Sequence, residues 1–132
     1  MIISTYFVNV QDKTLVLGIR KDGAVEIVEG QTYEKDNQKQ LWNAHYTSEE
    51  PRQCTLQNSD SGHYLGADSS MKPIMNTKVY WWNVSEAGIN VGFQVPGGLG
   101  SYTVELEDDK SVAWPIGCDA ALFLTLVAGQ TR

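Results

Sequence analysis

The sequence contains little cysteine, with only Cys54 and Cys118 among its 132 residues. A single possible bridge is far from the dense disulfide framework that holds small secreted domains together. The chain is long enough to bury a core of its own, so we expect one domain over residues 1–132 that needs neither disulfides nor metal. Within that domain Cys54 should be a buried free thiol that packs as a small apolar side chain.

Sustained apolar runs are also absent from the chain. Residues 1–6 contain neither a basic segment nor a long hydrophobic stretch, so they predict a first strand and not a signal peptide. Apolar residues never recur at helical spacing over three turns, which excludes a helical solenoid and predicts few helices. We therefore expect no membrane insertion, and a protein that is cytoplasmic or is released without a signal peptide.

Basic residues are few and scattered. Ten Lys and Arg stand against sixteen Asp and Glu, for a formal net charge of -6. Nucleic acids and anionic membranes are bound mainly through clustered Lys and Arg. The charge pattern therefore predicts that nucleic acid is not a partner.

The sequence lacks the motifs of known catalytic and metal sites. Its two histidines, His45 and His63, belong to no His-Glu-x-x-His spacing and accompany no nucleophile elbow. Each of them is expected to be hydrogen-bonded within the fold or exposed to solvent. We predict a protein that is not an enzyme and that has no catalytic residues, no metal site and no cofactor.

What the sequence does contain is a series of short apolar or alternating stretches separated by turn residues, which is typical of β-strands and hairpins. Trp42, Trp82 and Phe123 lie in three of these stretches, at intervals of about 40 residues. A second series aligns without gaps at intervals of about 48 residues, and each member is a short alternating strand followed by a turn that contains Asp. That series comprises residues 6–13, 54–61 and 102–109. Two series that agree on three copies indicate an internal threefold repeat.

The three copies cover residues of about 3–48, 49–95 and 96–132. Four strands are predicted in each of the first two copies, whereas in the third copy one of the four is hard to place. A propeller needs at least about four blades of this size, so three units are better closed into one barrel capped by hairpins. The predicted fold class is all-β, a β-trefoil of three four-stranded repeats with pseudo-threefold symmetry.

The segment Gln40-Leu41-Trp42, with Asn37 and Gln38 just upstream, resembles the Gln-x-Trp motif of the ricin B-like β-trefoil lectin superfamily. Short fungal lectins and the small trefoil haemagglutinin subunits of clostridial toxin complexes are similar members. The resemblance implies carbohydrate binding in shallow pockets, one per repeat, built from an Asp near the second strand, an aromatic platform, and Asn or Gln before the Trp. It also implies that Trp42, Trp82 and Phe123 are structural residues of the core.

The chain departs from this pattern where many fungal relatives carry the Asp. Gly18 and Gly66 stand there in the first two repeats, and Trp114 or Pro115 in the third. The second repeat is the better candidate for a sugar pocket, because it supplies aromatic faces with polar tips, and the first repeat is a weaker one. The candidate carbohydrate-binding residues are Tyr64, Asp68, Asn76, Lys78, Tyr80 and Trp81 in the second repeat and Tyr33, Asn37 and Gln38 in the first. Trp81 should point away from the side on which Trp82 lies.

Three functions are compatible with these features. The first is a lectin-like protein that binds a glycan or glycoprotein through a shallow loop pocket in the second repeat. The second is a non-catalytic partner subunit of a larger protein complex, with degenerate sugar sites. The third is a trefoil protease inhibitor, for which residues 18–21 are the only basic loop that resembles bait for a trypsin-like pocket.

Overall fold

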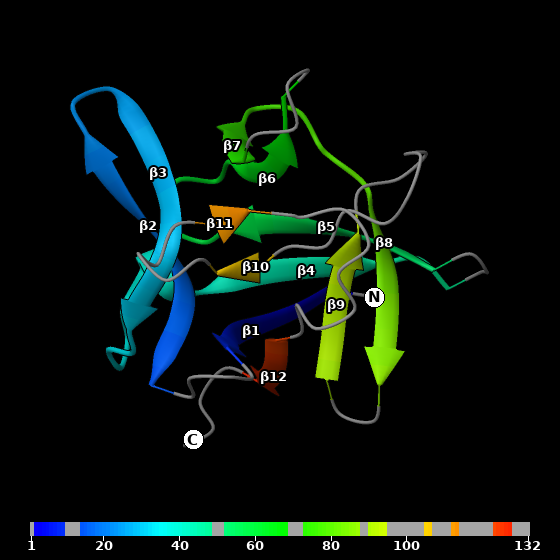
Figure 1. The fold of residues 1–132 in the computed structure, drawn as a ribbon. Helices are drawn as coiled ribbons and strands as arrows, with labels where there is room; N and C mark the ends of the chain where they lie inside the picture. The colour runs from blue at the N-terminus through cyan, green and yellow to red at the C-terminus, as the bar shows by residue number, and fades with distance from the viewer. Residues whose placement is uncertain are drawn as a thin grey trace.

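The computed structural model describes residues 2–9, 14–48, 52–68, 73–87, 90–94, 105–106, 112–113 and 123–127. These residues form twelve strands and one short 3-10 helix (Figure 1). The elements of the first unit are β1 (Ile2–Asn9), β2 (Leu15–Asp22), β3 (Val25–Thr32), η1 (Gln38–Gln40) and β4 (Trp42–Tyr46). Those of the second unit are β5 (Gln53–Asn58), β6 (Tyr64–Ala67), β7 (Pro73–Asn76) and β8 (Trp82–Ala87). The third unit contains β9 (Asn90–Gln94), β10 (Glu105–Leu106), β11 (Val112–Ala113) and β12 (Phe123–Val127).

Six of the strands close into a ring. The first strand of each unit pairs antiparallel with the fourth strand of its own unit and with the fourth strand of the unit before it. The order around the ring is therefore β1, β4, β5, β8, β9, β12 and back to β1. The other strands pair as the hairpins β2–β3, β6–β7 and β10–β11. This closed barrel with three hairpins is the predicted β-trefoil.

The strand register places the three repeated aromatic residues at equivalent positions. Within its own unit, Trp42 pairs with Thr5, Trp82 with Cys54, and Phe123 with Val91. Across the unit boundaries, Trp42 pairs with Asn58 of β5, which lies four residues after Cys54. Phe123 likewise pairs with Asn9 of β1, which lies four residues after Thr5. The backbone therefore has the pseudo-threefold relation that the spacing of these aromatic residues predicts.

The third unit begins differently from the gapless alignment. Its first strand by pairing is β9, whereas the alignment gave that role to residues 102–106. Residues 105 and 106 instead form β10, the first strand of a hairpin. The alignment was wrong here because it assumed equal loop lengths in all three units, and loops tolerate insertions that the barrel strands do not. When β9 is assigned to the third unit, that unit has four strands like the other two.

The core of the described residues is built from the inward sides of the barrel strands and the first two hairpins. Its largest fully buried side chains include Phe7, Leu17, Trp42, Leu56 and Trp82. Trp42 Nε1 donates to the carbonyl of Leu17 at 3.0 Å, and Trp82 Nε1 donates to the carbonyl of Leu65 at the same distance. Each of these tryptophans therefore ties the fourth strand of its unit to the second strand, which confirms their structural role.

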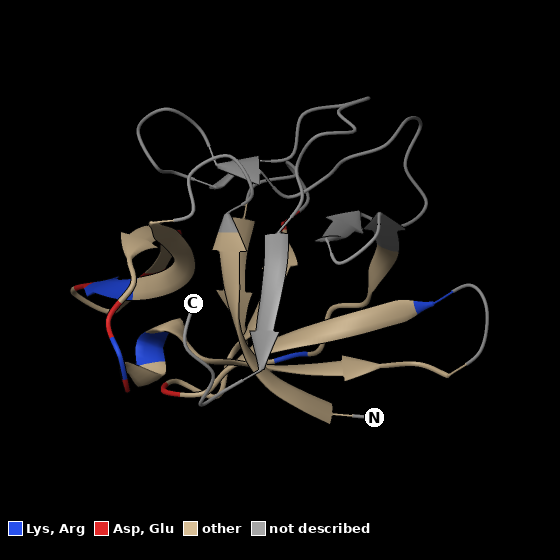
Figure 2. Ribbon diagram, turned by 90° about the horizontal axis from the view of Figure 1, so that it is seen from below, with Lys and Arg blue, Asp and Glu red and all other residues tan. Residues whose placement is uncertain are grey.

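Cys54 is a buried free thiol, as predicted, and burial raises its pKa to about 12. Cys118 lies outside the described residues. In the part of the chain that the structure covers, there is no helix with the length and apolar character required to cross a membrane. The described Lys and Arg lie on several separate elements (Figure 2).

Candidate functional site

The glycines at the positions of the expected Asp residues are closely packed by neighbouring side chains. Leu17 and Leu65 accept equivalent indole hydrogen bonds, so the residues that follow them, Gly18 and Gly66, occupy equivalent positions. A Cβ atom at Gly18 would collide with the Gln31 carboxamide, whose Cδ would be 2.7 Å away, and a Cβ atom at Gly66 would lie 3.1 Å from Cβ of Tyr80. At these two positions a neighbouring side chain lies close to the place where the side chain of a larger residue would begin.

Gln40 of the Gln-x-Trp motif is fully buried and fixes the loop that precedes it. Its Nε2 donates to the carbonyl of Thr32 at 2.9 Å and to Oε1 of Gln31 at 3.1 Å, and its Oε1 accepts from the backbone N–H of Glu34 at 2.9 Å. Every polar atom of this carboxamide is thus used inside the first unit. Gln40 is therefore a structural residue.

The three candidates in the first repeat all make contacts within the protein. Asn37 caps η1, with its Oδ1 accepting from the Lys39 N–H at 3.0 Å. The Ser59 hydroxyl donates to Gln38 Oε1 at 2.8 Å, which joins the first unit to the second. The Tyr33 ring stands edge-on to the ring of Tyr6, with 5.1 Å between centroids. Tyr33 and Asn37 are half-buried and Gln38 is exposed, so these side chains border the surface while supporting the fold.

In the second repeat, three of the six candidates share one face of the β6–β7 hairpin. Tyr64 and Asn76 are directly opposite each other in the register. Tyr80 covers Gly66, which lies two residues after Tyr64 and hence on the same face of the strand. Lys78 follows in the next turn, where its backbone N–H donates to Asn76 Oδ1 at 3.2 Å. Burial raises the pKa of Tyr80, whose ring packs against Trp82 at 4.8 Å.

The other two candidates of the second repeat lie apart from this face. Asp68 is half-buried and directly follows the last residue of β6. The Trp81 ring is 6.1 Å from the ring of His45 on β4, whereas Trp82 beside it is fully buried in the core. Trp81 therefore points away from Trp82, as predicted, and this takes it away from the side of Tyr80.

A cleft of about 390 Å³ lies between β3 and β7. Among the described strands, β3 pairs only with β2 and β7 pairs only with β6, so the cleft separates two edges of the sheet. In Figure 1 these two strands belong to neighbouring hairpins, one from the first unit and one from the second. Of the nine candidate residues only Asn76 lines this cleft, and the others that do are Ala24, Val25, Glu26, His63, Pro73, Ile74, Met75 and Thr77.

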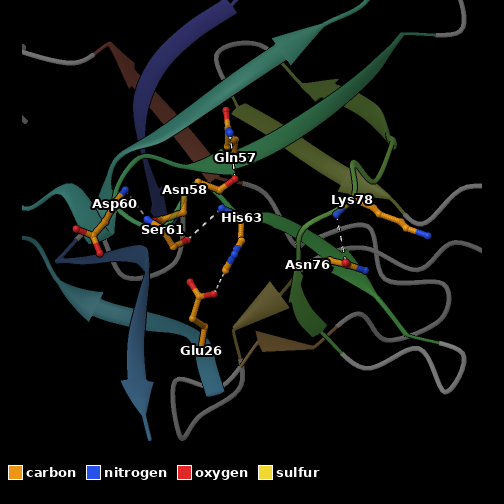
Figure 3. A network of polar contacts seen from close by, with 9 residues as sticks. Glu26, Gln57, Asn58, Asp60, Ser61, His63, Asn76 and Lys78 are labelled. Atoms are coloured by element: carbon orange, nitrogen blue, oxygen red, sulfur yellow. Dashed lines mark hydrogen bonds and ion pairs between the residues drawn. The ribbon is translucent and has the colours of Figure 1, made fainter. Parts of the chain in front are cut away.

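Glu26 and His63 pair across the two units in this cleft (Figure 3). Oε2 of Glu26 contacts Nδ1 of His63, and the Glu26 side chain is only 8% exposed. Its second oxygen, Oε1, is buried and has no hydrogen-bond partner among the described residues. Burial alone would raise the pKa of this carboxyl, but interactions with His63 and Ser61 and the charge of Lys21 outweigh burial and lower the pKa. The carboxylate is therefore ionised at neutral pH.

Sequence reasoning missed Glu26 because its partner is 37 residues away in the chain. The expectation for the histidines holds, since His63 is hydrogen-bonded and His45 is exposed. One sequence feature could have pointed to Glu26. It lies just after an Asp-Gly turn, which places it at the tip of a hairpin, where side chains of a neighbouring unit can reach the carboxylate.

The basic segment expected as an inhibitor loop is not a loop. Residues 18–21 lie inside β2, where Arg20 pairs with Ile27 of β3. Arg20 Nε also donates to Glu29 Oε1 at 2.8 Å. A protease inhibitor presents its bait residue on an accessible extended loop, so the prediction that this segment is a bait loop was wrong. The segment is not a loop because β2 pairs with β3 along its whole length.

Neither a protein-family model nor a curated protein matches this sequence. Solved structures do match its fold. A mosquitocidal holotoxin aligns with a TM-score of 0.77 at 14% identity, covering 96% of this chain but 17% of its own. The Macrolepiota procera ricin B-like lectin in complex with lactose aligns with a TM-score of 0.76 at 16% identity, over 92% of this chain and 93% of its own.

The β-trefoil lectin of the Vibrio vulnificus hemolysin/cytolysin, with N-acetyl-D-lactosamine bound, aligns with a TM-score of 0.71 at 11% identity over 99% of this chain and 98% of its own. At such identities the likeness shows the fold. The chain is a β-trefoil protein, and the solved structures that it matches include ricin B-like lectins, in agreement with the resemblance carried by the Gln-x-Trp motif.

Proposed function

We propose that this protein binds a glycan or glycoprotein, as a lectin does, through the face of the β6–β7 hairpin in the second repeat. The observation that carries the proposal is the grouping of Tyr64, Asn76 and Tyr80 on that face, with Lys78 in the adjoining turn. The structural neighbours support it, because two of them are named as lectins and hold lactose or N-acetyl-D-lactosamine.

The chemistry of this face suits a sugar. A pyranose offers hydroxyl groups that need donors and acceptors, and an apolar C–H face that packs on an aromatic ring. The half-buried rings of Tyr64 and Tyr80 supply the aromatic surface, while the Asn76 amide and the Lys78 ammonium group supply polar atoms. We leave Trp81 out of this pocket because it lies on the side of His45. Tyr33, Asn37 and Gln38 remain a second, weaker group, since each already supports the first unit.

A glycan array with the soluble protein tests the proposal. We expect binding of at least one glycan, and a loss of roughly three- to tenfold in affinity for Tyr64→Ala, because that variant loses one aromatic contact. Trp81→Ala is the matched control, since it also truncates a half-buried aromatic side chain of the second repeat but one that lies on the side of His45, and it should bind as the wild type does. The absence of any glycan signal at high protein concentration would contradict the proposed function.

A second candidate is a non-catalytic subunit or module of a larger protein complex. The observation that favours it is the match to 17% of a holotoxin chain, where the same fold forms one part of a larger protein. The glycines that fill the expected carboxylate positions are also compatible with a trefoil whose family sugar sites are degenerate. Sedimentation of the protein in extract from its native source, which would show a defined assembly of fixed composition, distinguishes this candidate from a free lectin.

A further inference from the structure

A row of uncharged polar side chains adjoins the face of the β6–β7 hairpin. Ser4 of β1 is directly opposite Asn43 of β4, which is opposite Gln57 of β5. Gln57 is in turn opposite Tyr64 of β6. Directly opposite residues of neighbouring antiparallel strands lie on the same face of a sheet. Ser4, Asn43 and Gln57 therefore form one line, which we call the wall row, and this line ends at Tyr64 of the proposed glycan face.

The wall row is accessible to a ligand. Its members alternate along β4 and β5 with the buried core residues Ala44 and Leu56, so they point outward from the barrel. Ser4 is exposed, and Asn43 and Gln57 are half-buried. The strands β1, β4 and β5 lie side by side across the barrel (Figure 1). A ligand can thus contact the polar atoms of the row without entering a cavity.

The wall around the row carries no acidic residue, lysine or arginine among its described positions. The outward-facing residues there are Ile2 and Ser4 on β1, Asn43 and His45 on β4, and Gln53, Thr55 and Gln57 on β5. A cationic ligand finds no carboxylate on this wall, and an anionic ligand is disfavoured by a chain whose formal net charge is -6. The wall therefore suits a neutral ligand.

Two hydrogen bonds hold the amides of the wall row in place. Ser4 Oγ donates to Asn43 Oδ1 at 2.6 Å, and Gln57 Nε2 donates to the carbonyl of Gly62 at 3.0 Å. A carboxamide has two N–H donors and one oxygen acceptor. These bonds therefore leave both donors of Asn43, and one donor and the oxygen of Gln57, for a ligand. Amides that are fixed in advance also lose less side-chain entropy when a ligand binds.

We propose that the wall row is an extension of the glycan face, which binds the further sugar residues of a neutral oligosaccharide whose first residue lies against Tyr64. This inference rests on the proposed glycan-binding function and deepens it, because it assigns a linear neutral glycan of several residues as the preferred ligand. Ser4 and Tyr64 are three strand spacings apart, or roughly 14 Å, which is longer than one sugar ring. Sugar hydroxyl groups both donate and accept hydrogen bonds, and the two amides offer both kinds of partner.

Isothermal titration calorimetry with oligosaccharides of increasing length tests the extension. The probes are three neutral linear series, namely N-acetyllactosamine repeats, chitooligosaccharides and cellooligosaccharides, each as the disaccharide, the tetrasaccharide and the hexasaccharide. We expect at least one series to bind roughly tenfold or more tightly as the tetrasaccharide than as the disaccharide, because only the longer chain also contacts the wall row.

Three variants locate this gain. Asn43→Ala and Gln57→Ala should each weaken binding of the tetrasaccharide by roughly three- to tenfold and leave binding of the disaccharide unchanged. Gln53→Ala is the matched control, since Gln53 is also a half-buried glutamine on the outer side of β5, but it lies four residues before Gln57 and its Nε2 donates to Asn83. That variant should bind both lengths as the wild type does. Thermal unfolding establishes that each variant is folded.

The variant Asn43→Ala keeps the test decisive if Gln57→Ala disturbs the turn that contains Gly62. Asn43 is two strands away from Tyr64, so a loss for the tetrasaccharide alone places the longer chain on the wall row. An equal loss for both lengths would instead show a structural role for Asn43 and overturn the extension.

The remaining outcomes separate this inference from the proposed function. Equal affinities of the disaccharide and the tetrasaccharide in every series that binds, or a gain that survives Asn43→Ala unchanged, would overturn the extension and leave glycan binding intact. The absence of binding by all three series also overturns the extension, and it reaches the proposed function only if the glycan array is empty as well.

Discussion

Alanine in place of Gly66 should destabilise the fold by about 1–2 kcal/mol, because the added methyl group would press against Tyr80. A Cβ atom at position 66 would lie 3.1 Å from both Cβ and Cδ2 of Tyr80. Rotation of the tyrosine ring can move Cδ2 but not Cβ, so the backbone of residue 80 has to shift as well. The resemblance to ricin B-like lectins implies Asp at this position, so the experiment asks whether packing is what favours glycine here.

The magnitude follows from how far Tyr80 can move. Carbon atoms in favourable contact are about 3.5–4.0 Å apart, so the side chain must retreat by a few tenths of an ångström. Trp82 limits that retreat, since its ring is fully buried and lies 4.8 Å from the Tyr80 ring. Added methyl groups in packed sites typically cost about 1–3 kcal/mol, and the half-buried position of Tyr80 places this one in the lower part of the range.

Urea unfolding, followed by tryptophan fluorescence, measures the free energy of unfolding of the wild type, Gly66→Ala, Tyr80→Gly and the double variant. Glycine is used at position 80 because alanine would retain the Cβ atom that the new methyl group meets. If the clash is with Tyr80, the double variant should be more stable than the sum of the two single effects predicts, by about 1 kcal/mol or more.

Gly62→Ala is the control: its φ of +75° makes alanine unfavourable by about 1–2 kcal/mol, but no atom lies within 4 Å of the new Cβ. Its effect should add to that of Tyr80→Gly. Additive effects of Gly66→Ala and Tyr80→Gly would refute the packing explanation.

Three further predictions concern the core and the cleft. Trp42→Phe should lower the free energy of unfolding by about 2–3 kcal/mol, because it leaves the Leu17 carbonyl without its indole donor; a urea midpoint equal to that of the wild type would contradict this. In a Cys118→Ser background, Cys54 should react with a thiol reagent at pH 8 far more slowly in the native protein than in urea, since burial raises its pKa to about 12; equal rates would show that the thiol is accessible. The pKa of Glu26 is lowered from 4.5 by His63 and its neighbours despite burial, so its stabilisation is present above pH 4.5 and lost as the pH falls through the folded value. The melting temperature of the wild type should therefore fall more steeply below pH 4.5 than that of Glu26→Gln, and parallel curves would count against the pairing.

The barrel was predictable from the sequence because its cause is local and repeated. Each unit places an aromatic residue at the same position of its fourth strand, and the spacing of Trp42, Trp82 and Phe123 exposes that pattern directly. The start of the third unit was not predictable in the same way. Both β9 and residues 102–106 alternate in polarity, and only the pairing of strands decides which of them belongs to the ring.

The candidate site was predictable only in part, for a similar reason. Tyr64 and Asn76 belong to one hairpin, so local strand logic brings them together. Trp81 was included because it is aromatic, but it precedes β8 and its ring lies against that of His45. The contact of Glu26 with His63 joins two units through their hairpins, and no local pattern encodes such a distant contact.

The pairing of β1 with β12 has a consequence for synthesis on the ribosome. Strand β1 is translated before the other described strands, but one of its two barrel partners, β12, is the last of these strands to be made. Until β12 emerges, β1 and β9 each present an unpaired edge, and such edges favour association with other nascent chains. A stalled or truncated polypeptide that lacks β12 should therefore be retained by chaperones or aggregate, even though eleven of the twelve described strands have already been translated.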